Sequence, residues 1–161
     1  MNFHHISKDV SGERYREMVR RLLEISASFS LVLRDELDFE PESSSLLHAL
    51  SPFEQKRERR DRWPGTRTFA RNKPIIAYFR SSPEVLGTLC EPQSLFSWRA
   101  PRYPEDPAFY DHNSEPLFAT TAHESEAWVL QRVAVKALAQ LVTLRIEVIR
   151  GDAIPIILGA A

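Results

Sequence analysis

Residues 98–128 read W-R-A-P-R-Y-P-E-D-P-A-F-Y-D-H-N-S-E-P-L-F-A-T-T-A-H-E-S-E-A-W. Three prolines stiffen the first part of this segment, because the proline ring locks the backbone dihedral φ. Residues 108–110 and 116–121 have the composition of β-strands, and the turn-forming residues 111–114 between them predict a hairpin. The segment combines more turn-forming residues with more chemically capable side chains than any other stretch, so we place it at the centre of the predicted fold.

Elements on both sides of this hairpin predict an α+β fold. Residues 74–79 are continuously apolar, which is typical of a strand inside a sheet. The complete set comprises strands at 29–34, 74–79, 108–110 and 116–121, and helices at 11–26, 83–90 and about 125–149. We therefore expect a small, mostly antiparallel sheet packed against three helices. The end of the last helical segment, T-L-R-I-E-V-I-R (143–150), is also compatible with a strand.

Length and composition predict a single globular domain over residues 1–161. Of the 161 residues, 43% are hydrophobic and 27% are charged, which is normal for a globular protein. The only cysteine, Cys90, excludes an internal disulfide. The sequence shows neither a signal peptide nor an uninterrupted apolar run of about 18 residues, so it predicts a cytoplasmic protein that does not cross a membrane.

The charged residues form two blocks of opposite sign. Residues 35–42 contain five acidic side chains, and residues 56–71 contain seven Lys or Arg. Phosphate binding needs such a basic cluster, but the formal net charge of −1 and the acidic block upstream favour mutual neutralisation, so nucleic-acid binding is not expected. The acidic block is interpreted as a solvated loop; the functional alternatives are mimicry of a polyanion and contact with a basic partner.

Residues Trp63, Pro64, Gly65 and Thr66 form a second turn signal. Proline presets φ at the second position of a turn, and glycine permits the positive φ that a type II turn requires at the third. The Trp63 side chain then either covers the core, which is the preferred interpretation, or stands exposed as a binding anchor.

Three segments in one order carry a resemblance to a known family. They are W-P-G-T (63–66), P-E-D-x-x-F-Y (104–110) and A-T-T-A-H-E-S-E-A-W (119–128). These resemble a family of small, uncharacterised bacterial proteins with W-P-G-T, P-E-D-L-x-F and T-I-A-H-E segments, some of which carry a sporulation-type name. The resemblance covers about residues 60–128 and implies that the segments belong to one module, but it implies no activity. The chain departs from the pattern at Pro107, where leucine is expected, and in its long helical end, which leaves open whether residues 130–161 belong to the same core.

His123 and Glu124 are the strongest candidates for chemistry. The zinc-protease motif H-E-x-x-H fails because alanine stands at position 127, so no metal site is expected. The five glycines are scattered singly, so no phosphate-binding loop and no cofactor are expected. A small acid–base hydrolase using His123, Glu124 and Asp106 is the alternative function, and it requires these side chains to converge in an open cleft.

The leading prediction is a cytoplasmic bacterial protein-binding module; catalysis is left open but not favoured. An inhibitor or immunity-type partner of a toxin or enzyme is one specific form of it. Aromatic side chains supply interface anchors, and rigid proline loops lower the ordering cost of binding. The predicted binding residues are Trp63, Gly65, Thr66, Trp98, Tyr103, Glu105, Asp106, Tyr110 and Trp128. This prediction requires the hairpin and the Trp63 turn to meet as one exposed surface. The apolar tail 153–161 is either a last strand or a segment that docks on a second subunit of a homo-oligomer.

Overall fold

An antiparallel sheet forms the centre of the protein. The computed structural model describes residues 2–148 and 154–158. Its strands are β1 (Asn2–Ile6), β2 (Ser28–Leu33), β3 (Glu54–Arg59), β4 (Arg62–Trp63), β5 (Thr66–Arg67), β6 (Ile75–Arg80), β7 (Glu105–Tyr110), β8 (Pro116–Thr121), β9 (Glu126–Val129) and β10 (Arg145–Val148). Its helices are α1 (Gly12–Ile25), α2 (Pro41–Leu50), α3 (Leu86–Leu89), α4 (Arg132–Leu138) and α5 (Ile154–Ile157). Within the described residues, eight strands pair in the order β10-β1-β9-β8-β7-β2-β6-β3, and β4 and β5 form a separate hairpin.

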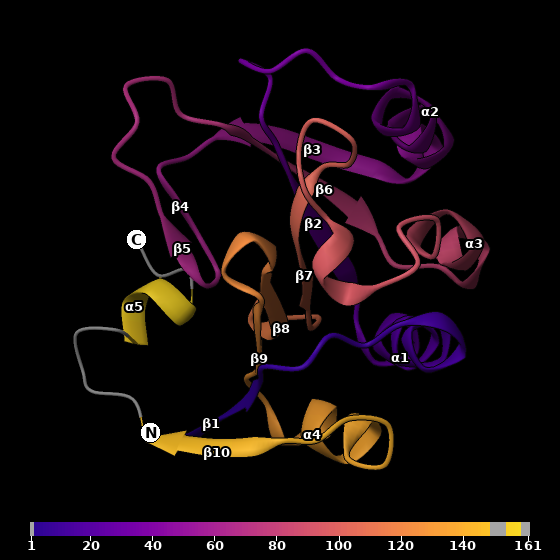
Figure 1. Ribbon diagram of the computed structural model, residues 1–161, viewed down its shortest axis with the longest axis vertical. Helices are drawn as coiled ribbons and strands as arrows, with labels where there is room; N and C mark the ends of the chain where they lie inside the picture. The colour runs from indigo at the N-terminus through magenta and orange to yellow at the C-terminus, as the bar shows by residue number, and fades with distance from the viewer. Residues whose placement is uncertain (1, 149–153, 159–161) are drawn as a thin grey trace.

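The two faces of the sheet are covered differently. Helices α1, α2, α3 and α4 lie on one face, whereas the β4–β5 hairpin and α5 lie on the other (Figure 1). Successive side chains of a strand point to opposite faces, and β2 shows the consequence. Its Phe29, Leu31 and Leu33 join the main core beneath the helices, while Val32 packs against Trp63 of the hairpin. The sheet is therefore buried on both sides in its middle.

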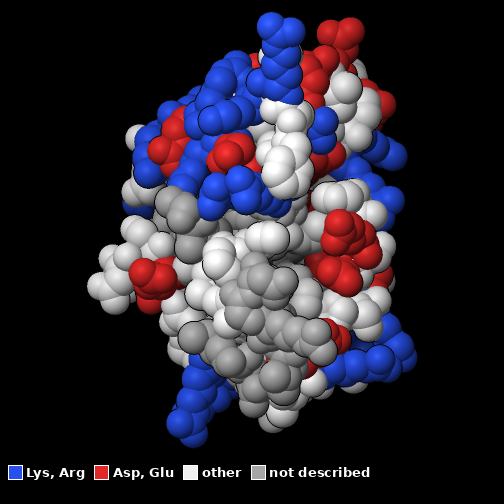
Figure 2. All heavy atoms as spheres, turned by 90° about the vertical axis from the view of Figure 1, so that its left-hand side faces the viewer, with Lys and Arg blue, Asp and Glu red and all other residues white. Residues whose placement is uncertain are grey.

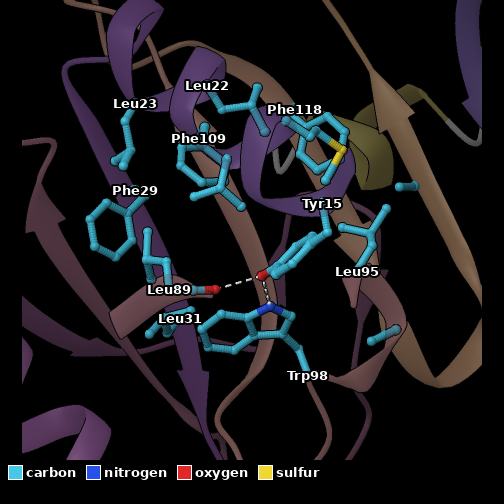
Figure 3. Close-up of a cluster of buried hydrophobic side chains, with 14 of the residues drawn as sticks. Tyr15, Leu22, Leu23, Phe29, Leu31, Leu89, Leu95, Trp98, Phe109 and Phe118 are labelled. Carbon is cyan, nitrogen blue, oxygen red and sulfur yellow. Dashed lines mark hydrogen bonds between the residues drawn. The ribbon is translucent and has the colours of Figure 1, made fainter. Parts of the chain in front are cut away.

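A hydrogen-bonded pair of aromatic residues joins α1 to the chain that leads into β7. The Trp98 indole N–H donates to the Tyr15 hydroxyl over 2.7 Å, and that hydroxyl donates to the Leu89 backbone carbonyl over 2.7 Å (Figure 3). Both aromatic residues are buried in the main core. Because each buried polar group finds a partner, the large rings contribute their apolar area without an unsatisfied polar atom.

The α+β class predicted from the sequence is confirmed. The predicted strands at 29–34, 74–79 and 116–121 correspond to β2, β6 and β8, and the helix predicted at 11–26 corresponds to α1. The sheet is larger than predicted, because it also contains β1, β3, β9 and β10. No helix among the described residues is long and apolar enough to cross a bilayer.

The single helix predicted over about 125–149 is wrong. The structure has β9, α4 and β10 there, which confirms the strand alternative for residues 145–148; residues 149 and 150 lie outside the described part of the chain. In β9, Ala127 and Val129 face the main core while Trp128 faces the other side, which is the two-residue period of a strand. A left-handed Ser125 (φ 56°) separates β9 from the preceding turn and is incompatible with a helix starting at that point.

The apolar tail contains α5 where a strand was the alternative. Ile157 of α5 is buried against Phe3 and Trp128 of the same chain. This short helix therefore covers part of one face of the sheet. Positions 153 and 159–161 of the predicted docking segment lie outside the described residues.

Candidate functional site

A buried aspartate joins the three sequence segments that carry the family resemblance. The Trp63 indole N–H donates to Oδ2 of Asp106 over 2.9 Å, and the backbone N–H of Ala122 donates to Oδ1 over 2.9 Å. Trp63, 43 residues before Asp106, and Ala122, 16 residues after it, thus bind the same carboxylate. Together with Gly65 and Thr121, described below, these residues form what we call the Asp106 clamp.

The Asp106 carboxyl group is almost sealed from solvent. The residue is 1% exposed, and its burial raises the pKa of the carboxyl from 3.8 to about 6, against the opposing effect of the N–H donors of Trp63 and Ala122. Asp106 also has a left-handed backbone with φ of 50°, a conformation that Asp tolerates better than most residues. Its role here is to hold chain segments together, since both oxygens are occupied by protein donors.

Gly65 is required by two features of the same clamp. Its φ is 88°, and a Cβ atom at this position would lie 2.6 Å from Oγ1 of Thr121. The Thr121 hydroxyl donates to the Gly65 carbonyl over 3.4 Å, and the Gly65 N–H donates to the Ile156 carbonyl of α5 over 2.8 Å. The turn predicted at residues 63–66 is therefore the place where the β4–β5 hairpin is fastened to β8 and α5.

The predicted catalytic residues do not converge in an open cleft. The side chains of His123 and Glu124 are 51% and 58% exposed and lie 3.7 Å apart, so they form a solvent-facing pair. Asp106, by contrast, lies in the interior beneath Trp63 and Ala122. Among the described residues, no group of three His, Cys, Asp or Glu side chains is placed to hold a metal ion. The geometry required by the hydrolase alternative is therefore missing.

The aromatic residues of the predicted binding set are buried, so the prediction that they form an exposed surface is wrong, whereas the preferred interpretation of Trp63 as a residue that covers the core agrees with the structure. Trp63, Trp98, Tyr103, Tyr110 and Trp128 are each at most 9% exposed. Large aromatic rings carry the most apolar area of any side chains, so the same property that favours them at interfaces also favours them in a core. The hairpin and the Trp63 turn do meet, but as an interior contact.

The other predicted binding residues take part in intramolecular contacts. Glu105 accepts from Arg34 over 3.5 Å, Tyr103 packs against Trp98 with ring centroids 6.2 Å apart, and Trp128 stacks on His5 at 4.5 Å. Thr66 is half-buried. Tyr103 and Trp128 are thus packed within the protein.

The exposed feature that sequence reasoning missed lies beyond the turn, in the loop after β5. We call residues 62–73, which comprise β4, β5 and this loop, the basic arm. Phe69 is 86% exposed at its tip, and the Arg67 guanidinium lies 5.1 Å from the Phe69 ring centroid. Within the described residues, Arg67, Arg71 and Lys73 have no carboxylate within ion-pair distance. The sequence signal was a lone phenylalanine inside T-R-T-F-A-R-N-K, where no apolar periodicity explains it.

Ion pairs within the protein engage several residues of both charge blocks. Asp35 pairs with Arg59 at 2.7 Å, and Glu42 lies 3.8 Å from Arg102. Hydrogen bonding to Arg59 lowers the pKa of the Asp35 carboxyl below its usual value. Asp35, Glu36 and Glu42 of the acidic block thus form ion pairs within the protein. Figure 2 shows Lys and Arg gathered over the part of the molecule where Figure 1 places β3 and the basic arm.

Comparison of the chain with protein-family models, with curated proteins and with solved structures finds no match.

Proposed function

We propose that this protein is a protein-binding module and that the tip of the basic arm recognises an acidic segment of another protein. The observation that carries the proposal is the exposed Phe69 ring, which has the Arg67 guanidinium 5.1 Å from its centroid. An inhibitor or immunity-type protein is one specific form of such a module.

The chemistry of the tip suits an amphipathic acidic partner. Removing a Phe side chain from water contributes roughly 2 kcal/mol. Arg67 lies over the Phe69 ring, where the cation and the ring face attract each other. A partner that covers this ring would also bring carboxylates within reach of Arg67 and Arg71, and Phe and Arg are both enriched at protein interfaces.

The root of the arm is rigid, which supports a binding role for its tip. Trp63 is fastened to Asp106, and Gly65 to Ile156 and Thr121. Because a held loop loses little conformational freedom on association, more of the contact energy appears as affinity. The Asp106 clamp therefore has a structural explanation in this proposal: it positions the arm.

The small number of available cations favours an acidic protein segment over a nucleic acid. The neighbouring arginines of β3 are engaged, Arg57 with Glu54 and Arg59 with Asp35. Nucleic-acid affinity depends on neutralising several phosphates along a backbone, whereas the tip offers one cation, Arg67, against one exposed ring. A short acidic peptide segment matches this footprint.

A matched pair of double variants tests the proposal. Phe69→Ala with Arg71→Ala removes an exposed apolar residue and a cation from the arm, while Val133→Ala with Arg132→Ala makes the equivalent change on exposed α4, on the helix side of the sheet. The wild-type protein is used to capture partners from nuclease-treated lysate of its host, and the captured protein is purified for affinity measurement.

We expect the arm variant to weaken binding of the purified partner at least about tenfold, since several interface side chains are lost, and the α4 variant to bind like the wild type. Cross-linking should place the arm against an acidic segment, and added salt should weaken the complex. Equal binding by both variants, or a partner that is captured only when the nuclease is omitted, would refute the proposal.

A further inference from the structure

A hollow lies beside the basic arm, on the face of the sheet opposite helices α1–α4. Its volume is about 480 Å³, which falls within the range of small-molecule sites. The side chains that decide its chemistry are Lys56, Arg60, Trp63, Tyr78, Tyr110 and Leu158. These come from the edge strand β3 and the residue after it, the β4–β5 hairpin, strands β6 and β7, and the residue after α5.

Small residues of β2 create the space. Ser30 is paired in register with Tyr78 of β6, and Ser28 with Tyr110 of β7, so two serines lie between two tyrosines. The ring centroids of Tyr78 and Tyr110 are 5.9 Å apart. The Tyr110 hydroxyl is buried and hydrogen-bonded to Ser30 Oγ over 2.9 Å. The floor of the hollow is therefore aromatic and held in place.

One wall of the hollow is apolar. Trp63 and Pro64 of the hairpin and Leu158 after α5 supply it. Trp63 cannot swing away without breaking its 2.9 Å hydrogen bond to Asp106. An aromatic floor with a fixed apolar wall favours a flat apolar body in the ligand.

Two cations line the hollow: Lys56 of β3 and Arg60, the residue after β3. Lys56 Nζ lies 4.5 Å from the Tyr78 ring centroid, and Arg60 lines the same hollow. Glu58 lies 3.8 Å from Lys56 and 3.4 Å from Arg60, longer than the 2.7–2.9 Å of a strong charge-assisted bond. One carboxylate thus faces two cations. Glu115, from the β7–β8 turn, is the acidic residue that lines the hollow.

We propose that this hollow is a binding site for a small organic anion with a flat apolar body, such as an aryl carboxylate or an aryl phosphate. The acid group lies against Lys56 and Arg60, and the body lies over Tyr78 and Tyr110 beside Trp63. Glu115 limits the affinity, because its charge repels the same ligand. This site is separate from the exposed tip of the basic arm, so the result of testing one proposal does not decide the other.

Amide NMR titration of the whole protein tests the site with four probes. 2-Naphthoate and phenyl phosphate have both an acid group and a flat body, and comparing them distinguishes a carboxylate from a phosphate ligand. Acetate has the charge without the body, and benzylammonium has the body with the opposite charge. We expect the two aryl anions to shift the amides of Ser28, Tyr78 and Tyr110 at millimolar concentration, and neither control probe to do so.

Variants then test the roles of the side chains. Lys56→Ala and Arg60→Gln should each weaken 2-naphthoate binding about tenfold, the effect of losing one charge-assisted contact. Glu115→Gln should strengthen it severalfold, a gain that unfolding cannot mimic. Lys8→Ala, at a different hollow of the surface, should have no effect. The proposal is overturned if benzylammonium binds as well as naphthoate, if the Lys56 and Arg60 variants bind like the wild type, or if no amide of the hollow shifts.

Discussion

Replacing Trp63 with phenylalanine removes the only indole N–H that reaches the Asp106 carboxylate among the described contacts. Trp98→Phe is a matched control, because Trp98 is also buried but donates to the neutral hydroxyl of Tyr15. A hydrogen bond to a charged group contributes about 1.5–3 kcal/mol, and one between neutral groups about 0.5–1.5 kcal/mol. Both substitutions remove the same atoms, so the loss of packing is common to both. We expect Trp63→Phe to lower the free energy of unfolding by about 1 kcal/mol more than Trp98→Phe at neutral pH.

The difference between these variants should depend on pH. Burial raises the pKa of Asp106 to about 6, so at about pH 7.5 the folded protein holds a charged carboxylate that needs its N–H donors. At about pH 5 the carboxyl is mostly protonated and accepts a weaker, neutral hydrogen bond. The difference in free energy of unfolding between Trp63→Phe and Trp98→Phe should therefore become smaller on acidification. The difference between Trp98→Phe and the wild type should not change with pH.

Urea denaturation followed by far-ultraviolet circular dichroism measures these free energies without relying on tryptophan fluorescence. Four values are needed: the loss in free energy of unfolding for each of the two variants at each of the two pH values, relative to the wild type under the same conditions. If Trp63→Phe is no more destabilised than Trp98→Phe at neutral pH, or if its deficit is independent of pH, the Asp106 clamp does not contain a charged acceptor and our account of it is refuted.

Three further predictions concern the same region and the single cysteine. The contribution of Asp106 to stability should fall by up to about 3 kcal/mol as pH rises from about 4 to about 6, because the folded state keeps the Asp106 proton that the unfolded chain has released; the difference between the wild type and Asp106→Asn in acid-range urea titrations should show this slope. Gly65→Ala should destabilise the protein by roughly 1–3 kcal/mol through its left-handed backbone and its collision with Thr121, and adding Thr121→Ala should recover only the part due to the collision, as a double-mutant cycle would show. Burial raises the pKa of the Cys90 thiol, so native protein should react with maleimide more slowly than urea-unfolded protein at the same pH; equal rates would contradict the half-buried position of this side chain.

Strong local patterns were the ones that predicted elements correctly. The apolar stripe of α1 and the alternation of β2 follow from burial of one face, which every amphipathic element must show in its own sequence. The Trp63 turn was also predictable, because positive φ requires glycine at position 65. The preferred interpretation of Trp63 as a residue that covers the core agrees with its 5% exposure.

Elements without a one-sided apolar pattern were missed. The edge strand β3 reads E-Q-K-R-E-R and is exposed along most of its length, so burial leaves no mark on its sequence. The short β9 has only four residues, and its alternation was absorbed into the helical spacing of the residues that follow.

The amino-acid order was sufficient for the α+β class, the main helix, the central strands and the turn at Gly65, because these depend on backbone preferences and on the period of apolar residues. It could not show that Asp106 receives Trp63 from one side and Ala122 from the other, nor that the aromatic residues turn inward while Phe69 turns outward. Such outcomes depend on which segments pack together. Packing depends on all the apolar segments of the chain together and not on any local pattern.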